Sequence, residues 1–170
     1  MPDLFDERKK QVLAPIFFEA GAALYDCQSF EYGIAYLLYL FSRLGATGLD
    51  PAHCASILDD EEKKTAGQLA QLLRKHLRIS EDIEEGLSKA LRARNHLVHR
   101  FLIENVERML EVREHDALVK EIRSLRSTVR GCQKKLDPFV RALAQSLDGA
   151  PLDMWAADAK EQFLRDTREH

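Results

Sequence analysis

Apolar side chains recur every three or four residues over most of the chain, which is the spacing of helices that bury one face. The first such region covers residues 7–44 and ends before Gly45. Pro15 lies inside it, so the part before Phe17 could form a separate short helix. Glu31 is one position away from the apolar stripe, where a carboxylate is usually exposed to water and only occasionally pairs with a buried arginine. The stripe consists of Ala20, Ala23, Cys27, Phe30, Ile34, Leu37 and Phe41.

The pattern weakens between residues 50 and 64. Asp50 and Pro51 indicate a turn or the start of a helix. Residues 59–62 are all acidic, and we interpret this run as a solvated helix N-terminus, favoured by the helix dipole, rather than as a metal site.

Two further helices are predicted in the middle of the chain. Residues 65–77 form a short amphipathic pattern that ends in basic residues. Ser80 is a good helix-capping residue, and the acidic residues directly after it suit the first turns of a helix. This second helix is expected to continue to about residue 101, so residues 92–101 lie on a helix rather than in a loop.

The most regular pattern occurs in the last third of the chain. Apolar residues there alternate steps of four and three, a 3.5-residue repeat typical of a long packing seam: Leu118, Ile122, Leu125, Val129, Cys132, Leu136, Phe139 and Leu143. The seam could be the core of a bundle or a dimer interface. Pro138 should bend this helix or mark a new start. Residues 151–170 carry Trp155 and Phe163 among many charges and could form a short docking helix.

These patterns define the predicted fold class. Of the 170 residues 45% are apolar and 31% are charged, which suits one globular domain, and strand-like alternation is almost absent. We therefore predict an all-α fold, an up-and-down four-helix bundle over residues 1–150 with a long C-terminal helix and a short tail.

Charge and cysteine content limit the partners and the location. A net charge of −3 excludes a polybasic nucleic-acid coat but not a local basic site. Residues 1–10 lack the apolar segment of a secretory signal, and the longest apolar stretch, residues 33–41, is too short to cross a bilayer. Three widely spaced cysteines favour reduced thiols over disulfides. We expect a cytoplasmic protein with no membrane partner.

The densest group of chemically useful side chains lies on the helix predicted to end near residue 101. Asn95 and His99 are four residues apart and therefore share a helix face. Arg94 is five residues before His99, so the two side chains start about 140° apart around the helix, but a flexible arginine can swing toward the same cleft.

The segment at residues 94–101, Arg-Asn-His-Leu-Val-His-Arg-Phe, resembles the Arg-polar-three-residue-His motif of HEPN domains. The bare spacing also fits other Arg and His pairs of this chain. An Asn directly after Arg94, an apolar pair before His99 and a place on a core helix distinguish this pair. The resemblance implies an α-helical bundle, commonly dimeric, of a family in which many members are metal-independent endoribonucleases of toxin–antitoxin, phage-defence and RNA-processing systems.

On this resemblance Arg94 and His99 take the positions of the catalytic pair, and Asn95 takes the polar position. His99 could accept the proton of the RNA 2′-hydroxyl or donate one to the departing 5′-oxygen. Arg94 could bind the phosphate and stabilise the negative charge of the transition state, while Asn95 could orient the histidine or contact a phosphate oxygen. A two-fold dimer would supply a second histidine, no metal or other cofactor is needed, and the product would end in a 2′,3′-cyclic phosphate.

Further basic side chains could bind the RNA backbone. They are Arg92, His96 and Arg100 beside the motif, and Arg126 and Arg130 on the long last helix. An antitoxin or regulatory protein is a further partner that the resemblance implies.

Several alternatives stay open. Asn95 and His99 could simply bond each other, and His96 with His99 could be two ligands of a metal, although no third ligand follows at a suitable spacing. The chain could also be a non-catalytic α-helical interaction or regulatory module that binds a protein through the seam or the tail.

Overall fold

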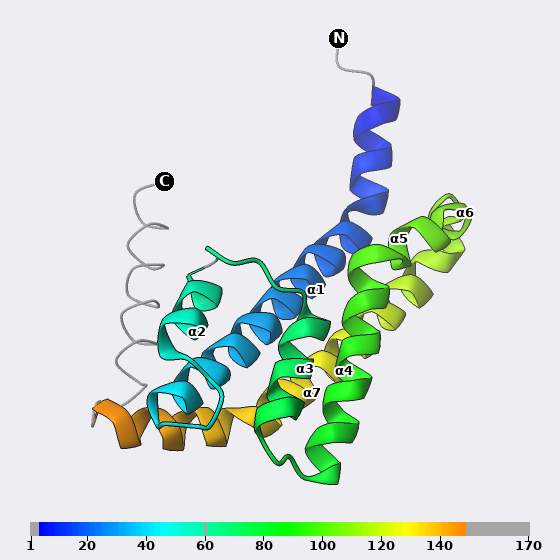
Figure 1. Ribbon diagram of the computed structural model, residues 1–170. Coiled ribbons are helices and arrows are strands. Elements are labelled where there is room, and N and C mark those ends of the chain that lie inside the picture. Colours follow the sequence, from blue (N-terminus) through cyan, green and yellow to red (C-terminus); the bar gives the residue numbers. More distant parts are fainter. Residues whose placement is uncertain (1–3, 60, 149–170) are drawn as a thin grey trace.

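The computed structural model describes residues 4–59 and 61–148, which form eight helical elements and no strand (Figure 1). They are α1 (Leu4–Arg43), α2 (Pro51–Leu58), α3 (Ala66–His76), α4 (Glu81–His99), α5 (Phe101–Glu104), α6 (Val106–Met109), the 3₁₀ helix η1 (Val112–Glu114) and α7 (His115–Asp148). The predicted all-α fold and the long last helix are confirmed. The up-and-down four-helix bundle stays a prediction, and the predicted tail at 151–170 lies outside the described residues.

The long helices α1, α4 and α7 pack against one another (Figure 1). Helix α7 runs in the same direction as α1, since Arg123 contacts Glu19 and Arg126 contacts Asp26 further along. Most of the core lies where these helices meet α2 and α3, and it includes Phe30, Ile34, Leu38, Leu73, Leu87 and Val129. A smaller core holds the start of α7 and α5 against α1, through Ile16, Ala23, Phe101, Leu118 and Ile122.

Local signals set the starts of three helices. The backbone N–H of His53 donates to the Asp50 carboxylate at 2.9 Å, and that of Ile83 donates to the Ser80 hydroxyl at 3.4 Å. Thr65 and Gln68 bond each other's backbone N–H groups in a capping box at the start of α3. The expected start at Asp50 and the expected cap at Ser80 are confirmed.

The structure overturns two expectations about helix ends and one of the two alternatives left open at Pro138. Pro15 does not separate a short helix, because α1 is continuous from Leu4 to Arg43 and only changes direction near this part (Figure 1). Pro138 lies inside α7 and does not start a new helix. The acidic run follows α2 instead of opening a helix, because Thr65 places the next start later, and Glu62 pairs with His53 and Lys64.

The heptad seam of α7 is core rather than an interface between copies. Its side chains Leu118, Ile122 and Val129 are fully buried, and Cys132 and Leu136 are nearly so. The pattern relaxes toward the end, where Phe139 is half exposed. Of the two uses left open for the seam, intramolecular packing is therefore the one observed.

Ion pairs join α1 to α7 on one side of this core. The Glu19 side chain is 6% exposed and accepts hydrogen bonds from Arg123 at 2.7 Å and from Arg126 at 2.5 Å. Arg126 also donates to Asp26 at 2.8 Å. The hydrogen bonds from Arg123 and then Arg126 lower the pKa of Glu19, although burial opposes them.

Glu19→Ala is expected to lower the free energy of unfolding by about 2 kcal/mol, because the partly buried Arg126 loses a partner. A lowered pKa means that the folded state favours the carboxylate. The ionised Glu19 therefore stabilises the fold fully at a pH above the pKa that this carboxyl has in the unfolded chain. The stabilisation is lost as the pH falls through its lower pKa in the folded protein. Urea unfolding should therefore separate wild type and variant at pH 7, and the two should converge in acid. Glu107→Ala, at an exposed site, is the control. Equal stability of the Glu19 and Glu107 variants at pH 7 would contradict the assignment.

Candidate active site

An open cleft of about 570 Å³ lies at the end of α4, where α4 faces the start of α3. Its lining residues are Thr65, Gly67, Arg92, Arg94, Asn95, His96, His99 and Arg100. Six of the eight come from the segment at residues 92–100 that the sequence singled out. The end of α4 is exposed at Asn95, His99 and Arg100, so the cleft is accessible to a ligand.

The guanidinium of Arg94 is held by three partners. Its Nε donates to Glu31 Oε1 of α1 at 2.6 Å, and its Nη1 donates to Asn95 Oδ1 at 3.0 Å. The same Nη1 lies 3.0 Å from His99 Nε2. The swing of Arg94 toward His99 is therefore confirmed. The N–H groups of Arg94 Nη2 donate a hydrogen bond to no described residue.

The contact between Arg94 and His99 bears on which ring nitrogen of the imidazole carries a proton. An arginine can only donate, so the 3.0 Å contact is a hydrogen bond only when Nε2 carries no proton. A neutral His99 would then carry its proton on Nδ1 and direct the Nε2 lone pair at Arg94. A ligand that draws the arginine donors to itself would release this lone pair for a proton.

Asn95 acts on Arg94 rather than on His99. Its side-chain oxygen accepts from the guanidinium, which differs from the alternative in which Asn95 and His99 simply bond each other. Among residues 4–59 and 61–148 no group of three or more His, Cys, Asp or Glu side chains could hold a metal ion.

The charges around the cleft favour an anionic ligand. Three arginines and two histidines line it, together with one asparagine, one threonine and one glycine, and no carboxylate is among the lining residues. Two acids next to lining residues are paired: Glu31 with Arg94, and Glu104 with His96. The N-terminus of α3 adds to this field, since the first backbone N–H groups of a helix and its dipole attract negative charge.

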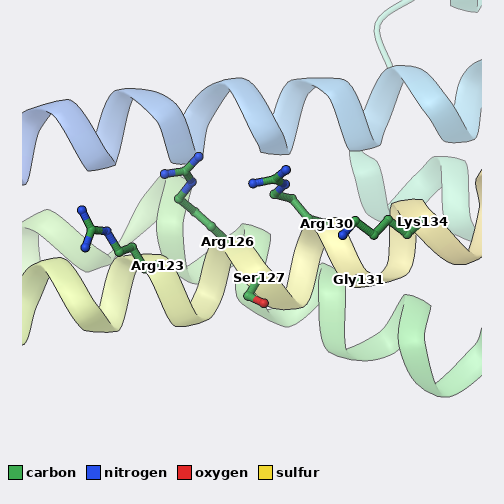
Figure 2. Close-up of a pocket in the computed structure, with 6 residues that line it drawn as sticks. All are labelled: Arg123, Arg126, Ser127, Arg130, Gly131 and Lys134. Atoms are coloured by element: carbon green, nitrogen blue, oxygen red, sulfur yellow. The ribbon is translucent and has the colours of Figure 1, made fainter.

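The remaining residues that the sequence predicted divide into two groups. His96 lies at the edge of the cleft, where its Nδ1 is 3.6 Å from Glu104 and its ring meets Phe101 edge-on, while Arg92 and Arg100 are exposed in the cleft. Arg126 and Arg130 are not brought to it. They line a separate hollow on α7 (Figure 2).

Three residues of the site were not predicted as such. Its position beside the apolar stripe makes Glu31 either a rim residue or an occasional partner of a buried arginine, and the structure shows it paired with Arg94. Thr65 and Gly67 reach the cleft from α3. The Thr65 and Gln68 capping pair could have marked the start of α3, but nothing in the sequence says that this start faces α4.

Comparisons with models of known protein families, with curated proteins and with solved structures found no match. No helix in the described ranges, 4–59 and 61–148, is long and apolar enough to cross a membrane.

Proposed function

We propose that this chain is a HEPN-like RNA-binding protein that cuts RNA as a metal-independent endoribonuclease and leaves 2′,3′-cyclic phosphate ends. The observation that carries the proposal is the 3.0 Å contact between Arg94 and His99 in an open cleft lined by cations and no carboxylate. An RNA phosphate is an anion of suitable size and geometry for an arginine and the first N–H groups of a helix.

The proposed bundle would consist of α1, α3, α4 and α7. Near its start α4 faces the far part of α7, since Asp82 pairs with Lys135, and α5 at the other end packs on Leu118. Helix α4 therefore runs opposite to α7. The antiparallel pairing of α4 with α7 fits the up-and-down bundle that the short links predict, whereas the parallel run of α1 and α7 does not.

The chemistry uses the nucleophile of the RNA itself. When the phosphate binds to Arg94, His99 Nε2 accepts the proton of the 2′-hydroxyl, and the 2′-oxygen forms a bond to phosphorus. The bond from phosphorus to the 5′-oxygen breaks, and that oxygen takes up a proton. Arg94 stabilises the extra negative charge of the transition state. The products are a 2′,3′-cyclic phosphate and a 5′-hydroxyl.

The departing 5′-oxygen takes its proton from an acid, and this acid must be a group other than the His99 that serves as the base. His96 is engaged with Glu104, so we assign the acid to His99 of a second copy of the chain. Large apolar side chains are exposed directly after the cleft helix, on α5, α6, η1 and the residue that follows α6: Ile103, Val106, Val112 and Leu110. Because apolar surface this close to the cleft is stabilised by burial, it favours a homodimer whose two clefts adjoin.

The double variant Ile103→Glu/Leu110→Glu is expected to elute as a monomer from a sizing column and to lose most RNA cleavage. Both side chains are more than 70% exposed, so the changes should leave the fold intact, while two buried charges would disrupt the interface. Leu44→Glu/Phe139→Glu makes the same charge change on exposed apolar residues elsewhere. A double variant at Ile103 and Leu110 that stays dimeric, or that cuts at the wild-type rate as a monomer, would exclude this interface.

The function is tested by incubating purified protein in EDTA with single-stranded and hairpin RNA and with 2′-deoxy versions of the same sequences. We expect the RNA to be cut and the 2′-deoxy strands to stay intact, because the latter lack the nucleophile. Cutting of the 2′-deoxy strands, or cutting that appears only with added metal, would contradict the mechanism. Absence of cutting together with capture of an antitoxin-like protein would favour the non-catalytic alternative.

A further inference from the structure

A second hollow, of about 410 Å³, lies on α7 where this helix faces α1. It is lined only by residues of α7: Arg123, Arg126, Ser127, Arg130, Gly131 and Lys134. Figure 2 shows three arginine side chains and one lysine side chain in a row along one face of α7, with Arg126 and Arg130 extended toward α1. It shares no lining residue with the cleft at the end of α4.

The cations of this row differ in what they contact. Arg123 and Arg126 are paired with the buried Glu19, and Arg126 also with Asp26, so these two belong to the packing of α1 against α7. Arg130 and Lys134 are exposed and contact no carboxylate among the described residues. Four cations thus meet two paired carboxylates, Glu19 and Asp26, and a third, Asp137, which borders Arg130 and Lys134 without an ion pair to either.

The hollow continues toward the solvent-exposed face of α1. A second, smaller hollow of about 280 Å³ shares Arg130 and Lys134 with the first. Its other lining residues are Tyr25, Asp26 and Ser29 of α1 and Gln133 and Asp137 of α7. Arg130 and Lys134, at the end of the row on α7, therefore border the aromatic ring of Tyr25 on α1. Asp26 is paired with Arg126, while Asp137 lines this hollow and forms no ion pair with either cation.

Exposed aromatic side chains follow this edge of α1. Phe18, Tyr25 and Tyr32 are seven residues apart, nearly two helical turns, and so they lie along one face. All three are largely exposed, and Tyr25, at 70%, borders the cations directly. A cationic groove flanked by exposed aromatic rings is the combination that binds single strands, because phosphates meet the cations and bases stack on the rings.

We propose that Arg130 and Lys134 bind the phosphates of single-stranded RNA and that Tyr25 stacks on one of its bases. This groove would be a second contact for the RNA that the α4 cleft cuts, so the choice of RNA rests on the proposed function. Arg130 and Lys134 are four residues, or about 6 Å, apart along the helix, so they can contact neighbouring parts of one strand. Arg126 serves the fold here rather than the ligand.

The experiment measures binding of a fluorescent single-stranded RNA in the His99→Ala background, so that cleavage plays no part. Arg130→Glu/Lys134→Glu is expected to weaken binding at least tenfold. The slope of the logarithm of affinity against the logarithm of salt concentration should become shallower by about 1.4, the value for two lost phosphate contacts. Lys75→Glu/Arg78→Glu makes the same change in net charge on exposed residues outside the groove and should bind nearly as the parent. Thermal unfolding checks that both variants fold.

Two further arms separate RNA from other polyanions. Tyr25→Ala should weaken RNA binding about tenfold through lost stacking and leave the salt dependence unchanged. Polyglutamate should compete poorly. Wild-type-like RNA binding by the Arg130/Lys134 variant overturns the groove, and competition by polyglutamate as strong as that of RNA overturns its assignment to RNA. Loss of binding in this variant supports the groove even if wild type cuts no RNA, a result that would reject only the proposed function.

Discussion

His99→Ala is expected to reduce RNA cleavage in EDTA by about 10²–10⁴-fold, the usual contribution of a general acid or base. The reason is that His99 carries the imidazole that lies 3.0 Å from Arg94, and its Nε2 is the atom that accepts the 2′-hydroxyl proton in the proposed reaction. Binding of RNA to the variant should change little, because the three arginines of the cleft and the start of α3 remain to attract phosphates. The measurement is the initial rate of cutting of an end-labelled RNA with enzyme in excess.

The matched control for His99 is His53→Ala. His53 lies on α2, is exposed and pairs with Glu62 at 3.0 Å, away from the cleft. This variant should cut at the wild-type rate, which would show that neither the purification nor the loss of a histidine as such changes the rate of cutting. Equal cutting by wild type and His99→Ala would identify the activity as a contaminant.

Arg94→Ala has the second-largest expected effect, a loss of about 10²–10³-fold, as for the removal of one oxyanion donor. Arg94→Lys should recover little of it. A lysine has one ammonium group and cannot keep Glu31, Asn95 and the phosphate at once in the geometry of a guanidinium. The loss should appear mainly in kcat, because the extra charge develops in the transition state.

A control separates chemistry from folding at this position. Arg94→Ala leaves the partly buried Glu31 without its partner, whereas Arg94→Ala/Glu31→Ala removes both charges. We expect the double variant to unfold at a higher temperature than the single variant but to remain as inactive. Arg92→Ala, an exposed arginine of the same cleft, should lose less than the Arg94 variants, because Arg92 contacts neither Arg94 nor His99. Restored cutting in the double variant would show that Arg94 acts only through stability.

Much of the fold could be predicted from the sequence because its signals are local. The apolar spacing of α1, α3, α4 and α7 and the caps at Asp50 and Ser80 depend on neighbours a few residues away. The effect of Pro15 depends instead on residues far along the chain. Proline disfavours a helix locally, but the buried Ile16 beside it packs on Phe101 and Leu118, and this distant packing keeps α1 continuous.

The candidate site could be predicted only in part. Arg94, Asn95 and His99 lie on one helix, so their spacing sufficed to bring them together. Glu31 is 63 residues from Arg94, and the start of α3 reaches the cleft from another helix, so both depend on how helices pack. The basic residues of α7 show the same limit: the sequence grouped Arg126 with Arg130, and only the buried carboxylates of α1 separate their roles.

The chemical identity of the cut ends tests the central claim most directly. RNA is cut in EDTA by wild type and, side by side, by His99→Ala, and the ends of the fragments are determined by mass spectrometry. Attack by the 2′-hydroxyl predicts a 2′,3′-cyclic phosphate on the upstream fragment, a 5′-hydroxyl on the downstream fragment and neither with His99→Ala. Fragments that end in a 3′-hydroxyl and a 5′-phosphate would mean that water attacked instead, and would contradict the roles given to Arg94 and His99.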